Sequence, residues 1–323
     1  MPRMPKLLFP DHRASAADQV TLMAYRLGWA ATRTLPAGAA YRLFDRGAAL
    51  MHRRGGKGVE RMRSNYARIR PELSAGELDD LVLAGLRSYL RYWCDSFRLP
   101  DRSAEELAAM VRVVGDEGPR AALENGQGVI CFLGHLGNWD TVGAWATHHL
   151  APVTTVAERL KPTELFDRFV AYRERLGMTI LPLTGGTAPF PTLVRTVHRG
   201  GLVPLLSDRD LTDSGVEVTL CGHRARMATG PAALALATGA PLHPVTVTYE
   251  PGPGRDGSGR PDPAAYRVVL TFGPRIPVPE GGTRAEQIGA LTQACADYLG
   301  HTLRGHTEDW HMMQKVFVAD GIR

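Results

Sequence analysis

One histidine of this chain is followed by an acid at a spacing that suits acid–base chemistry. The stretch GVICFLGHLGNWD, residues 128–140, places His135 after a short apolar run and Asp140 five residues later. A neutral imidazole takes a proton from a hydroxyl group, and a carboxylate on its other nitrogen fixes the tautomer. This is the arrangement of a serine-protease triad without the serine. No G-x-S-x-G motif occurs in the chain, so we expect the nucleophile to be a hydroxyl group of the substrate.

The residues around His135 predict that it lies at the end of a buried strand. Residues 129–133 are all apolar and run into Gly134, a pattern typical of a short buried strand. Asn138 fits the N-cap of a following helix. His135 is therefore expected at the carboxyl end of a strand, where open α/β sheets bind their ligands. Asp140, in the first turn of the helix, is expected to hold the imidazole ring.

The rest of the chain supplies the elements that would position this pair. Strand and helix patterns alternate after Asp140, which predicts an α/β fold with a mixed central sheet flanked by helices. We expect a helical region over residues 1–100 and an α/β core over residues 101–323, in one continuous domain. Helices are predicted at 59–70, 74–97, 105–113, 162–176, 189–198, 230–238 and 284–304, and strands at 153–156, 179–183, 202–206, 216–220, 242–249 and 266–272.

The N-terminal region carries features of a membrane-associating surface. A helical pattern from Asp18 to about Met51, split near Pro36, places Trp and Tyr beside arginines, as at a membrane interface. Packing of these rings against the core is the alternative. Residues 51–70 then contain seven Lys or Arg against one acid. This stretch indicates an anionic partner, namely a membrane, a nucleic acid or a phosphate-bearing ligand, unless it is simply a solvated helix face.

The composition and the absence of certain motifs argue against several classes of protein. The chain has 323 residues, 44% of them hydrophobic, and its longest uncharged run, 227–249, is interrupted by Gly and Pro, so we expect no transmembrane segment. Four separated cysteines without a CxxC motif suggest reduced thiols in a cytosolic protein. Phosphate-loop motifs are absent from the sequence. His148 and His149 raise a metal site as an alternative, but there is no HExxH motif and we expect no metal.

Several motifs together give the chain a family resemblance. The GHLGNWD stretch, AERLKP at 157–162, YRERLGM at 172–178, SDRD at 207–210 and GPAALALATGAPLHPV at 230–245 resemble the lysophospholipid acyltransferase superfamily, and within it the bacterial lipid A acyltransferase branch. The flanking segments RSYLRYWCDSFRLP, at 87–100, and EDWHMMQKVF, at 308–317, are similar to actinobacterial phosphatidylinositol mannoside acyltransferases. The resemblance covers roughly residues 20–318.

This resemblance implies an activity and a location. Such enzymes act at the cytoplasmic face of the plasma membrane as peripheral proteins. They move a fatty acyl group from acyl-CoA, a substrate rather than a cofactor, to a hydroxyl of a glycolipid. In the mannoside branch the acceptor is the mannose 6-hydroxyl of a phosphatidylinositol mannoside. The resemblance makes His135 the catalytic base and Asp140 its partner, and it implies an anionic membrane surface but no nucleic acid as a further partner.

The resemblance also implies roles for residues elsewhere in the chain. That branch is thought to use a glutamate from the second half of the sheet, for which Glu217 is the best match; the alternative is a half-exposed strand residue. Glu158, Arg159 and Arg173 match polar positions that line the acceptor or thioester site in relatives, although Glu158 and Arg173 could instead pair structurally.

Chemical reasoning adds further candidates for the substrate site. Arg209 and Arg226 are candidates to meet the phosphates of CoA or of the phosphoinositol, with plain surface arginines as the alternative. Backbone N–H groups of the turn 134–137 are expected to stabilise the oxyanion. The apolar side chains expected to wall an acyl groove, or to be plain core, are Phe132, Leu136, Trp139 and Trp145.

We expect direct transfer without an acyl-enzyme, because no activated Ser or Cys neighbours His135 in the sequence. Other functions remain open on the sequence alone. These are a thioesterase or metal hydrolase that uses water, a non-catalytic lipid-binding protein, and an acyltransferase with a lipid A-like or other glycolipid acceptor.

Overall fold

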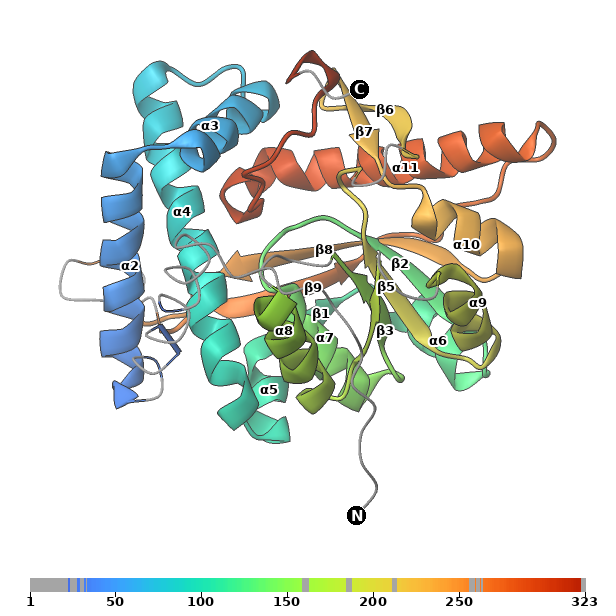
Figure 1. Ribbon diagram of the computed structural model, residues 1–323, viewed down its shortest axis with the longest axis horizontal. Coiled ribbons are helices and arrows are strands. Elements are labelled where there is room, and N and C mark those ends of the chain that lie inside the picture. Colours follow the sequence, from blue (N-terminus) through green and yellow to red (C-terminus); the bar gives the residue numbers. More distant parts are fainter. Residues whose placement is uncertain are drawn as a thin grey trace.

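A five-stranded mixed sheet forms the centre of the molecule (Figure 1). The computed structural model describes residues 34–158, 163–183, 188–210, 214–255 and 264–320, with positions 23, 28, 29, 32, 259 and 262. The strand order is β1-β9-β8-β2-β5. Strand β2 is parallel to both β5 and β8, whereas β8 and β9 are antiparallel, so the predicted mixed α/β sheet is confirmed. Its strands are β1 (Val111–Val114), β2 (Val129–Leu133), β5 (Leu202–Leu206), β8 (Leu242–Glu250) and β9 (Arg267–Phe272).

Both faces of the sheet are covered by helices, which explains why strand β2 consists of apolar residues only. Ile130 and Phe132 pack into the cluster that includes residues of α10 (Gly230–Thr238) and α11 (Arg284–Gly305). The intervening side chains, including Cys131, face the opposite cluster with α7 (Trp139–His149). Side chains alternate between the faces of a strand, so two covered faces require an unbroken apolar run.

Two small sheets and three more helices complete the α/β part. Strands β3 (Thr154–Ala157) and β4 (Thr179–Pro182) are parallel, and a bridge between Val153 and Leu202 joins β3 to the β5 edge. Strands β6 (Val216–Leu220) and β7 (His223–Met227) form a hairpin. The further helices are α6 (Glu117–Glu124), α8 (Thr163–Arg175) and α9 (Phe190–His198).

Two strands were not predicted, and one predicted helix is shorter than expected. The helix expected at 105–113 is α5 (Ala104–Met110), and the chain continues from it directly as strand β1. Val111 packs in the sheet core, and the β-branched residues that follow favour extended structure. Strand β7 was missed because His223 and the two arginines in HRARM hide the alternation of its buried side chains, Ala225 and Met227.

Helices α2 (Ala37–Arg54), α3 (Lys57–Ile69) and α4 (Ala75–Arg98) form a layer beside one end of the sheet (Figure 1). Helix α4 begins with a capping box between Ser74 and Glu77, as its sequence indicates. The layer is joined to the C-terminal segment, because the Asn65 side chain donates to the carbonyls of Met312 and Gln314. None of the described helices is long and apolar enough to cross a membrane.

Aromatic side chains expected to enter lipid from the N-terminal region pack instead on the protein. The ring of Trp29 lies 5.5 Å from Phe97 and 5.9 Å from Tyr172. Tyr41 is buried and donates a hydrogen bond to Asp95. For these rings the alternative of packing against the core is the one found. The remainder of the expected helix before position 34, including Tyr25, lies almost entirely outside the described residues.

Candidate active site

The register of two neighbouring strands brings His135 opposite an aspartate. Strands β2 and β5 are parallel, and Leu133 pairs with Leu206 at their carboxyl ends. The ladder continues with a hydrogen bond from the Ser207 N–H to the Leu133 carbonyl. His135 and Asp208 each lie two residues beyond the paired leucines, so their side chains meet at the carboxyl-terminal ends of the two strands.

Asp208 holds the imidazole ring of His135 in one orientation. The histidine Nδ1 lies 2.6 Å from Asp208 Oδ1, and the histidine backbone N–H donates to Oδ2 at 2.8 Å. The indole N–H of Trp310 donates to the same Oδ2 at 2.8 Å. Burial by itself raises the pKa of Asp208, but the nearby His135 and these hydrogen bonds bring the pKa below its ordinary value. The ionised carboxylate accepts Nδ1–H, which leaves Nε2 of the neutral ring without a proton.

The prediction that Asp140 holds the ring of His135 is wrong. Asp140 does lie in the first turn of α7, and Asn138 caps that helix by accepting from the Thr141 N–H at 2.9 Å. The Asp140 carboxylate, however, accepts a 2.6 Å hydrogen bond from Arg173 Nε and a 2.8 Å hydrogen bond from the Tyr92 hydroxyl. Asp140 is therefore engaged with α8 and α4, while the neighbouring parallel strand supplies the partner of the histidine.

The pair of Asp140 and Arg173 is buried at the wall of the site. Their side chains are 2% and 18% exposed. Burial lowers the pKa of Arg173, but the adjacent Asp140 outweighs it and raises the pKa above its ordinary value. The Tyr92 pKa is raised by burial and by the same carboxylate, so this phenol stays protonated. The alternative that Arg173 pairs structurally is thus found, with Asp140 rather than Glu158 as its partner.

His135 opens onto a cavity of about 640 Å³ whose walls are mostly apolar. The histidine side chain is 20% exposed. Trp139 forms one wall, stacked on Tyr92 with 4.3 Å between ring centroids and 5.6 Å from the ring of His135. Of the four side chains expected to wall an acyl groove, Trp139 lines this cavity, and the other three are not among its described lining residues. Other apolar lining residues are Trp93, Phe169, Met178, Leu193, Leu205 and Met313.

Charged side chains also line the cavity. Arg209 Nη2 donates to Glu158 Oε2 at 2.8 Å, and both residues line the cavity together with Arg173. Arg226 donates to the Gly215 carbonyl at 2.8 Å and lies 3.7 Å from Asp210, outside the described lining. Arg159 lies outside the described residues. Of the two arginines predicted to meet phosphate, the structure brings Arg209 to the cavity.

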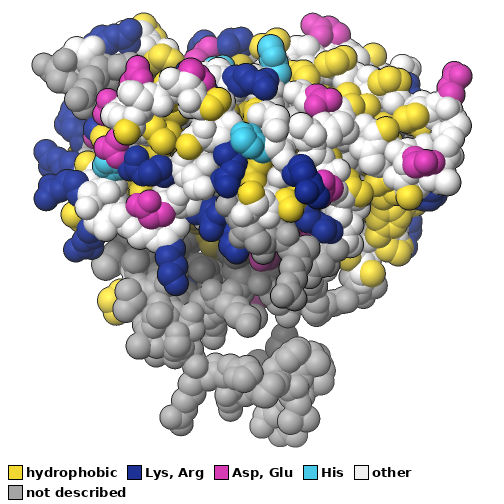
Figure 2. Space-filling model, turned by 90° about the horizontal axis from the view of Figure 1, so that it is seen from above, with side chains coloured by type: hydrophobic (Ala, Val, Ile, Leu, Met, Phe, Trp, Pro, Cys, Tyr) yellow, Lys and Arg dark blue, Asp and Glu magenta, His cyan; other side chains and the backbone are white. Residues whose placement is uncertain are grey.

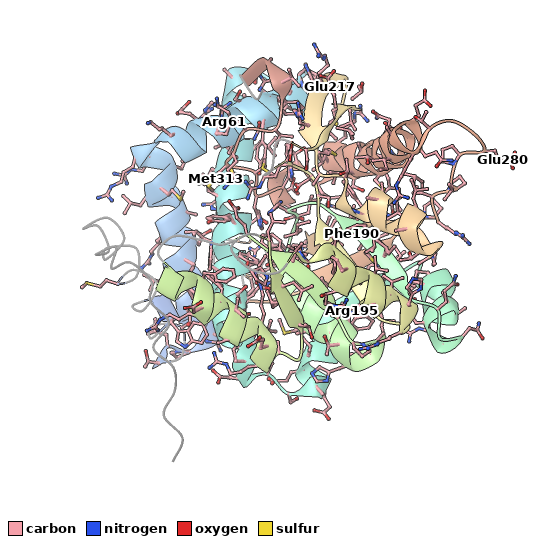
Figure 3. The ribbon with its side chains drawn as sticks, turned by 45° about the vertical axis from the view of Figure 1, so that its right-hand side comes forward. Arg61, Phe190, Arg195, Glu217, Glu280 and Met313 are labelled. Carbon is pink, nitrogen blue, oxygen red and sulfur yellow. The ribbon has the colours of Figure 1, made fainter. Side chains whose placement is uncertain are left out.

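Glu217 does not lie at the cavity. It is on the β6–β7 hairpin, and its carboxylate accepts from Arg224 Nη2 at 2.6 Å. In Figure 3 it lies at the hairpin, away from the cavity-lining Phe190. Its side chain is 44% exposed. Glu217 is therefore the half-exposed strand residue that the sequence left open as the alternative. The prediction that it approaches His135 is wrong.

Three of the four backbone N–H groups expected to stabilise the oxyanion are engaged within the protein. The His135 N–H donates to Asp208, the Leu136 N–H to the Gly134 carbonyl, and the Gly137 N–H to the Asp309 carbonyl. Gly137 has a φ of +53°, and a Cβ there would lie 2.5 Å from the Val247 carbonyl oxygen. The turn thus fixes the backbone of the histidine, and its three N–H groups at 135–137 are already engaged.

A second buried polar chain lies against the histidine. The His311 N–H donates to the His135 carbonyl at 2.8 Å, and His311 Nε2 is 3.0 Å from the Ser88 hydroxyl, which donates to Asp309 at 2.7 Å. Burial, with a smaller effect of His135, lowers the pKa of His311 to about 3. Burial raises the pKa of Asp309 to about 7. His311 therefore stays neutral beside the catalytic candidate.

The one group of potential metal ligands in the described residues is His306, Glu308 and Asp309. It does not include His135, His148 or His149. The Asp309 side chain already accepts from Ser88 and from the Tyr249 N–H.

Sequence reasoning did not identify Asp208 as the partner of His135, although a signal was present. The SDRD motif follows a predicted strand, as His135 does, and carboxyl ends of parallel strands meet at one sheet edge. That signal becomes decisive only when strands β2 and β5 are known to be neighbours. Trp310 and His311 come from the end of the chain, and nothing local in their sequence points to the histidine.

The chain is similar in sequence to known acyltransferases. The sequence model of the bacterial lipid A biosynthesis acyltransferases matches residues 11–318. A phosphatidylinositol mannoside acyltransferase of Mycolicibacterium smegmatis is 40% identical over 309 residues, which cover 95% of each chain. A protein of the same name from Mycobacterium tuberculosis is 40% identical over 313 residues, covering 96% of this chain and 92% of the relative.

Proposed function

Because this chain belongs to the family of bacterial lipid A biosynthesis acyltransferases, we propose that it transfers a fatty acyl group from acyl-CoA to the mannose 6-hydroxyl of phosphatidylinositol mannosides. The observation that carries the proposal is the ring of His135, held by buried Asp208 at the wall of a largely apolar cavity. The names of the mycobacterial relatives support the acceptor. The apolar walls suit an acyl chain, and the arginines that line the cavity, Arg173 and Arg209, suit a sugar phosphate.

In the proposed reaction His135 acts as a general base. Nε2 takes the proton of the mannose hydroxyl while the hydroxyl oxygen forms a bond to the thioester carbonyl carbon. The C–S bond then breaks, and the leaving thiolate of CoA takes the proton back from the imidazolium. The carboxylate of Asp208 on Nδ1 stabilises the imidazolium between these steps.

Transfer is proposed to be direct, without an acyl-enzyme. The cysteine closest in sequence to the site, Cys131, is buried, and burial raises the pKa of its thiol well above the ordinary value. The nucleophile is then the hydroxyl group of the acceptor. Treatment with radiolabelled palmitoyl-CoA alone, followed by denaturation, should leave no label on the protein; covalent label would contradict direct transfer.

The proposed location is the cytoplasmic face of the cell membrane, with the protein bound peripherally. Helix α2 supports this through two large apolar side chains seven residues apart on its outer face, Leu43 and Leu50, which are 48% and 46% exposed. The exposed residues Arg42 and Arg46 lie on the same helix. Apolar side chains that enter lipid beside arginines that meet headgroups are typical of interfacial helices.

The function is tested by incubating the purified protein with palmitoyl-CoA and phosphatidylinositol mono- or dimannoside and identifying the products by mass spectrometry. We expect a palmitoylated mannoside from the wild-type protein and none from His135→Ala with an unchanged circular dichroism spectrum. Hydrolysis of palmitoyl-CoA without acceptor product would indicate a thioesterase. Acylation of a lipid A precursor in preference to the mannosides would indicate another glycolipid acceptor, and binding without turnover a lipid-binding protein.

A further inference from the structure

A second cavity, of about 710 Å³, lies beside the first and has a different character. Three basic side chains line it: Lys57, Arg61 and Lys315, with Glu60 as the one acid among the lining residues that the structure describes. Lys57 and Arg61 come from α3, whereas Lys315 comes from the C-terminal segment. Figure 2 shows the face on which α3 lies, where Lys and Arg side chains gather mainly on the left and in the centre.

The structure separates the basic stretch 51–70 into residues with different roles. Arg63 pairs with Asp79, and Arg70 pairs with Glu72 at 2.5 Å. The Arg68 guanidinium lies over the Phe317 ring, 5.0 Å from its centroid. Arg53 and Arg54 are exposed at the end of α2. The basic side chains of this stretch that line the second cavity are Lys57 and Arg61, and the fold adds Lys315 from more than two hundred residues away.

The start of helix α3 adds backbone donors to this cavity. Its N-cap is Gly56, which offers no side-chain hydrogen bond to the first turn, and Gly56, Lys57 and Gly58 all line the cavity. A Cβ at Gly56 would meet nothing within 4 Å, so the space over this backbone is open. The uncapped N–H groups of a helix start and the positive end of its dipole attract anions. Lysine, arginine and helix start therefore converge on one volume.

The two cavities share a wall. Met313 and Gln314 line both of them, and in the view of Figure 3 Met313 lies between Arg61 and the Phe190 side chain of the first cavity. A molecule with its reacting end at His135 needs to pass these two residues to place an anionic group at Lys57, Arg61 and Lys315. Both substrates of the proposed reaction carry phosphate at a distance from their reacting atoms.

We infer that the cavity formed by Lys57, Arg61, Lys315 and the start of α3 binds a phosphate group of a substrate whose reacting end lies at His135. The inference rests on the proposed function for the identity of that substrate. The phosphate has two possible sources: the 3′-phosphate and diphosphate of CoA, or the phosphodiester of the mannoside lipid. Cationic side chains and free helix N–H groups bind either one, because both present anionic oxygens.

The test uses the full chain and water-soluble probes that bind without turnover. Dissociation constants are measured by titration calorimetry for CoA, for dephospho-CoA, which lacks the 3′-phosphate, and for glycerophosphoinositol mannoside, the deacylated acceptor headgroup. The variant is Lys57→Ala/Arg61→Ala/Lys315→Ala. The matched control, Arg46→Ala/Arg53→Ala/Arg54→Ala, removes the same number of charges from exposed positions of α2. An unchanged circular dichroism spectrum and melting temperature of the triple variant exclude unfolding as the cause of weaker binding. The single variant Lys315→Gln is a milder change and should weaken binding less than the triple variant.

We expect the triple variant to weaken binding of one probe about tenfold, because each of three charge contacts at exposed or partly exposed positions contributes up to about 1 kcal/mol. The control variant should weaken binding less than twofold. A loss for CoA that is smaller for dephospho-CoA identifies the donor phosphate, and a loss for the headgroup probe identifies the acceptor phosphodiester; both support the site. Equal binding of all three probes by variant and control overturns it. If the probes bind as expected but the wild-type protein transfers no acyl group, the proposed function fails and the phosphate site stands.

Discussion

The ring of His135 and the carboxylate of Asp208 lie 2.6 Å apart because each residue stands two positions beyond a paired leucine of neighbouring parallel strands. The carboxylate is buried and is also held by the indole N–H of Trp310 and the backbone N–H of the histidine. Such a network fixes both the tautomer and the orientation of the imidazole.

Asp208→Asn should abolish most of the activity while preserving the fold. An asparagine that keeps its oxygen toward the His135 and Trp310 N–H groups presents its NH₂ to Nδ1, which forces the proton onto Nε2 and removes the base. We expect kcat for acyl transfer to fall by about 10³–10⁴-fold. Glu217→Gln makes the same chemical change at an exposed side chain of the β6–β7 hairpin and should leave kcat within twofold. A large loss in Glu217→Gln with an active Asp208→Asn would reverse this assignment.

Asp140→Asn should act mainly on stability. It removes the partner of Arg173, whose guanidinium is left largely buried without its carboxylate. Loss of one member of a buried pair costs about 3–5 kcal/mol of unfolding free energy, measurable by urea denaturation. The double variant Asp140→Asn/Arg173→Met removes the stranded charge and should regain part of that loss. Strict additivity of the two single variants in this cycle would show that the pair is not coupled.

The buried His311 should contribute a loss of folding stability as the pH falls. Its pKa is lowered to about 3 in the folded protein, so the unfolded chain binds the proton first as pH falls. The stability it contributes is complete above pH 6.5 and is lost progressively toward pH 3; about 2 kcal/mol disappears between pH 6.5 and 5. Asp309, with a pKa raised to about 7, contributes with the opposite sign, because its protonation favours the folded state.

A comparison of variants isolates the histidine from Asp309. His311→Gln keeps a donor toward Ser88 and retains Asp309, so its unfolding free energy should fall less between pH 6.5 and 5 than that of the wild-type protein, by about 2 kcal/mol. His301→Gln changes an exposed histidine of α11 and should follow the wild-type curve. Parallel curves for the wild-type protein and His311→Gln would exclude this effect.

Helix α2 gives a separate test of membrane binding. Leu43→Glu/Leu50→Glu places two acids on the exposed face, where burial of the leucines in lipid would contribute about 1.5–3 kcal/mol each. Sedimentation with anionic phospholipid vesicles should show binding reduced by more than tenfold. Val114→Glu/Val278→Glu adds the same charge at exposed apolar positions outside α2 and serves as the control. An equal loss of vesicle binding in both variants would indicate an effect of net charge rather than of the exposed face of α2.

Local patterns in the sequence were enough to place His135. The apolar run of β2, Gly134 and the cap at Asn138 predicted a strand, a turn and a helix, and the structure has all three. These features depend on neighbouring residues alone, through side-chain periodicity, backbone freedom and capping hydrogen bonds. For the same reason most strands and helices were predicted close to their observed bounds, and the resemblance in sequence indicated the correct family.

Only the tertiary structure decided which groups surround the histidine. Asp140 is near in sequence but is hydrogen-bonded to Arg173 and Tyr92, and Glu217 is an exposed side chain of the β6–β7 hairpin. Asp208 meets the ring because β2 and β5 are adjacent and parallel, and Lys315 joins Lys57 because the C-terminal segment packs on α3. Strand order and long-range packing arise from burial summed over the whole chain, so no short stretch of sequence contains them.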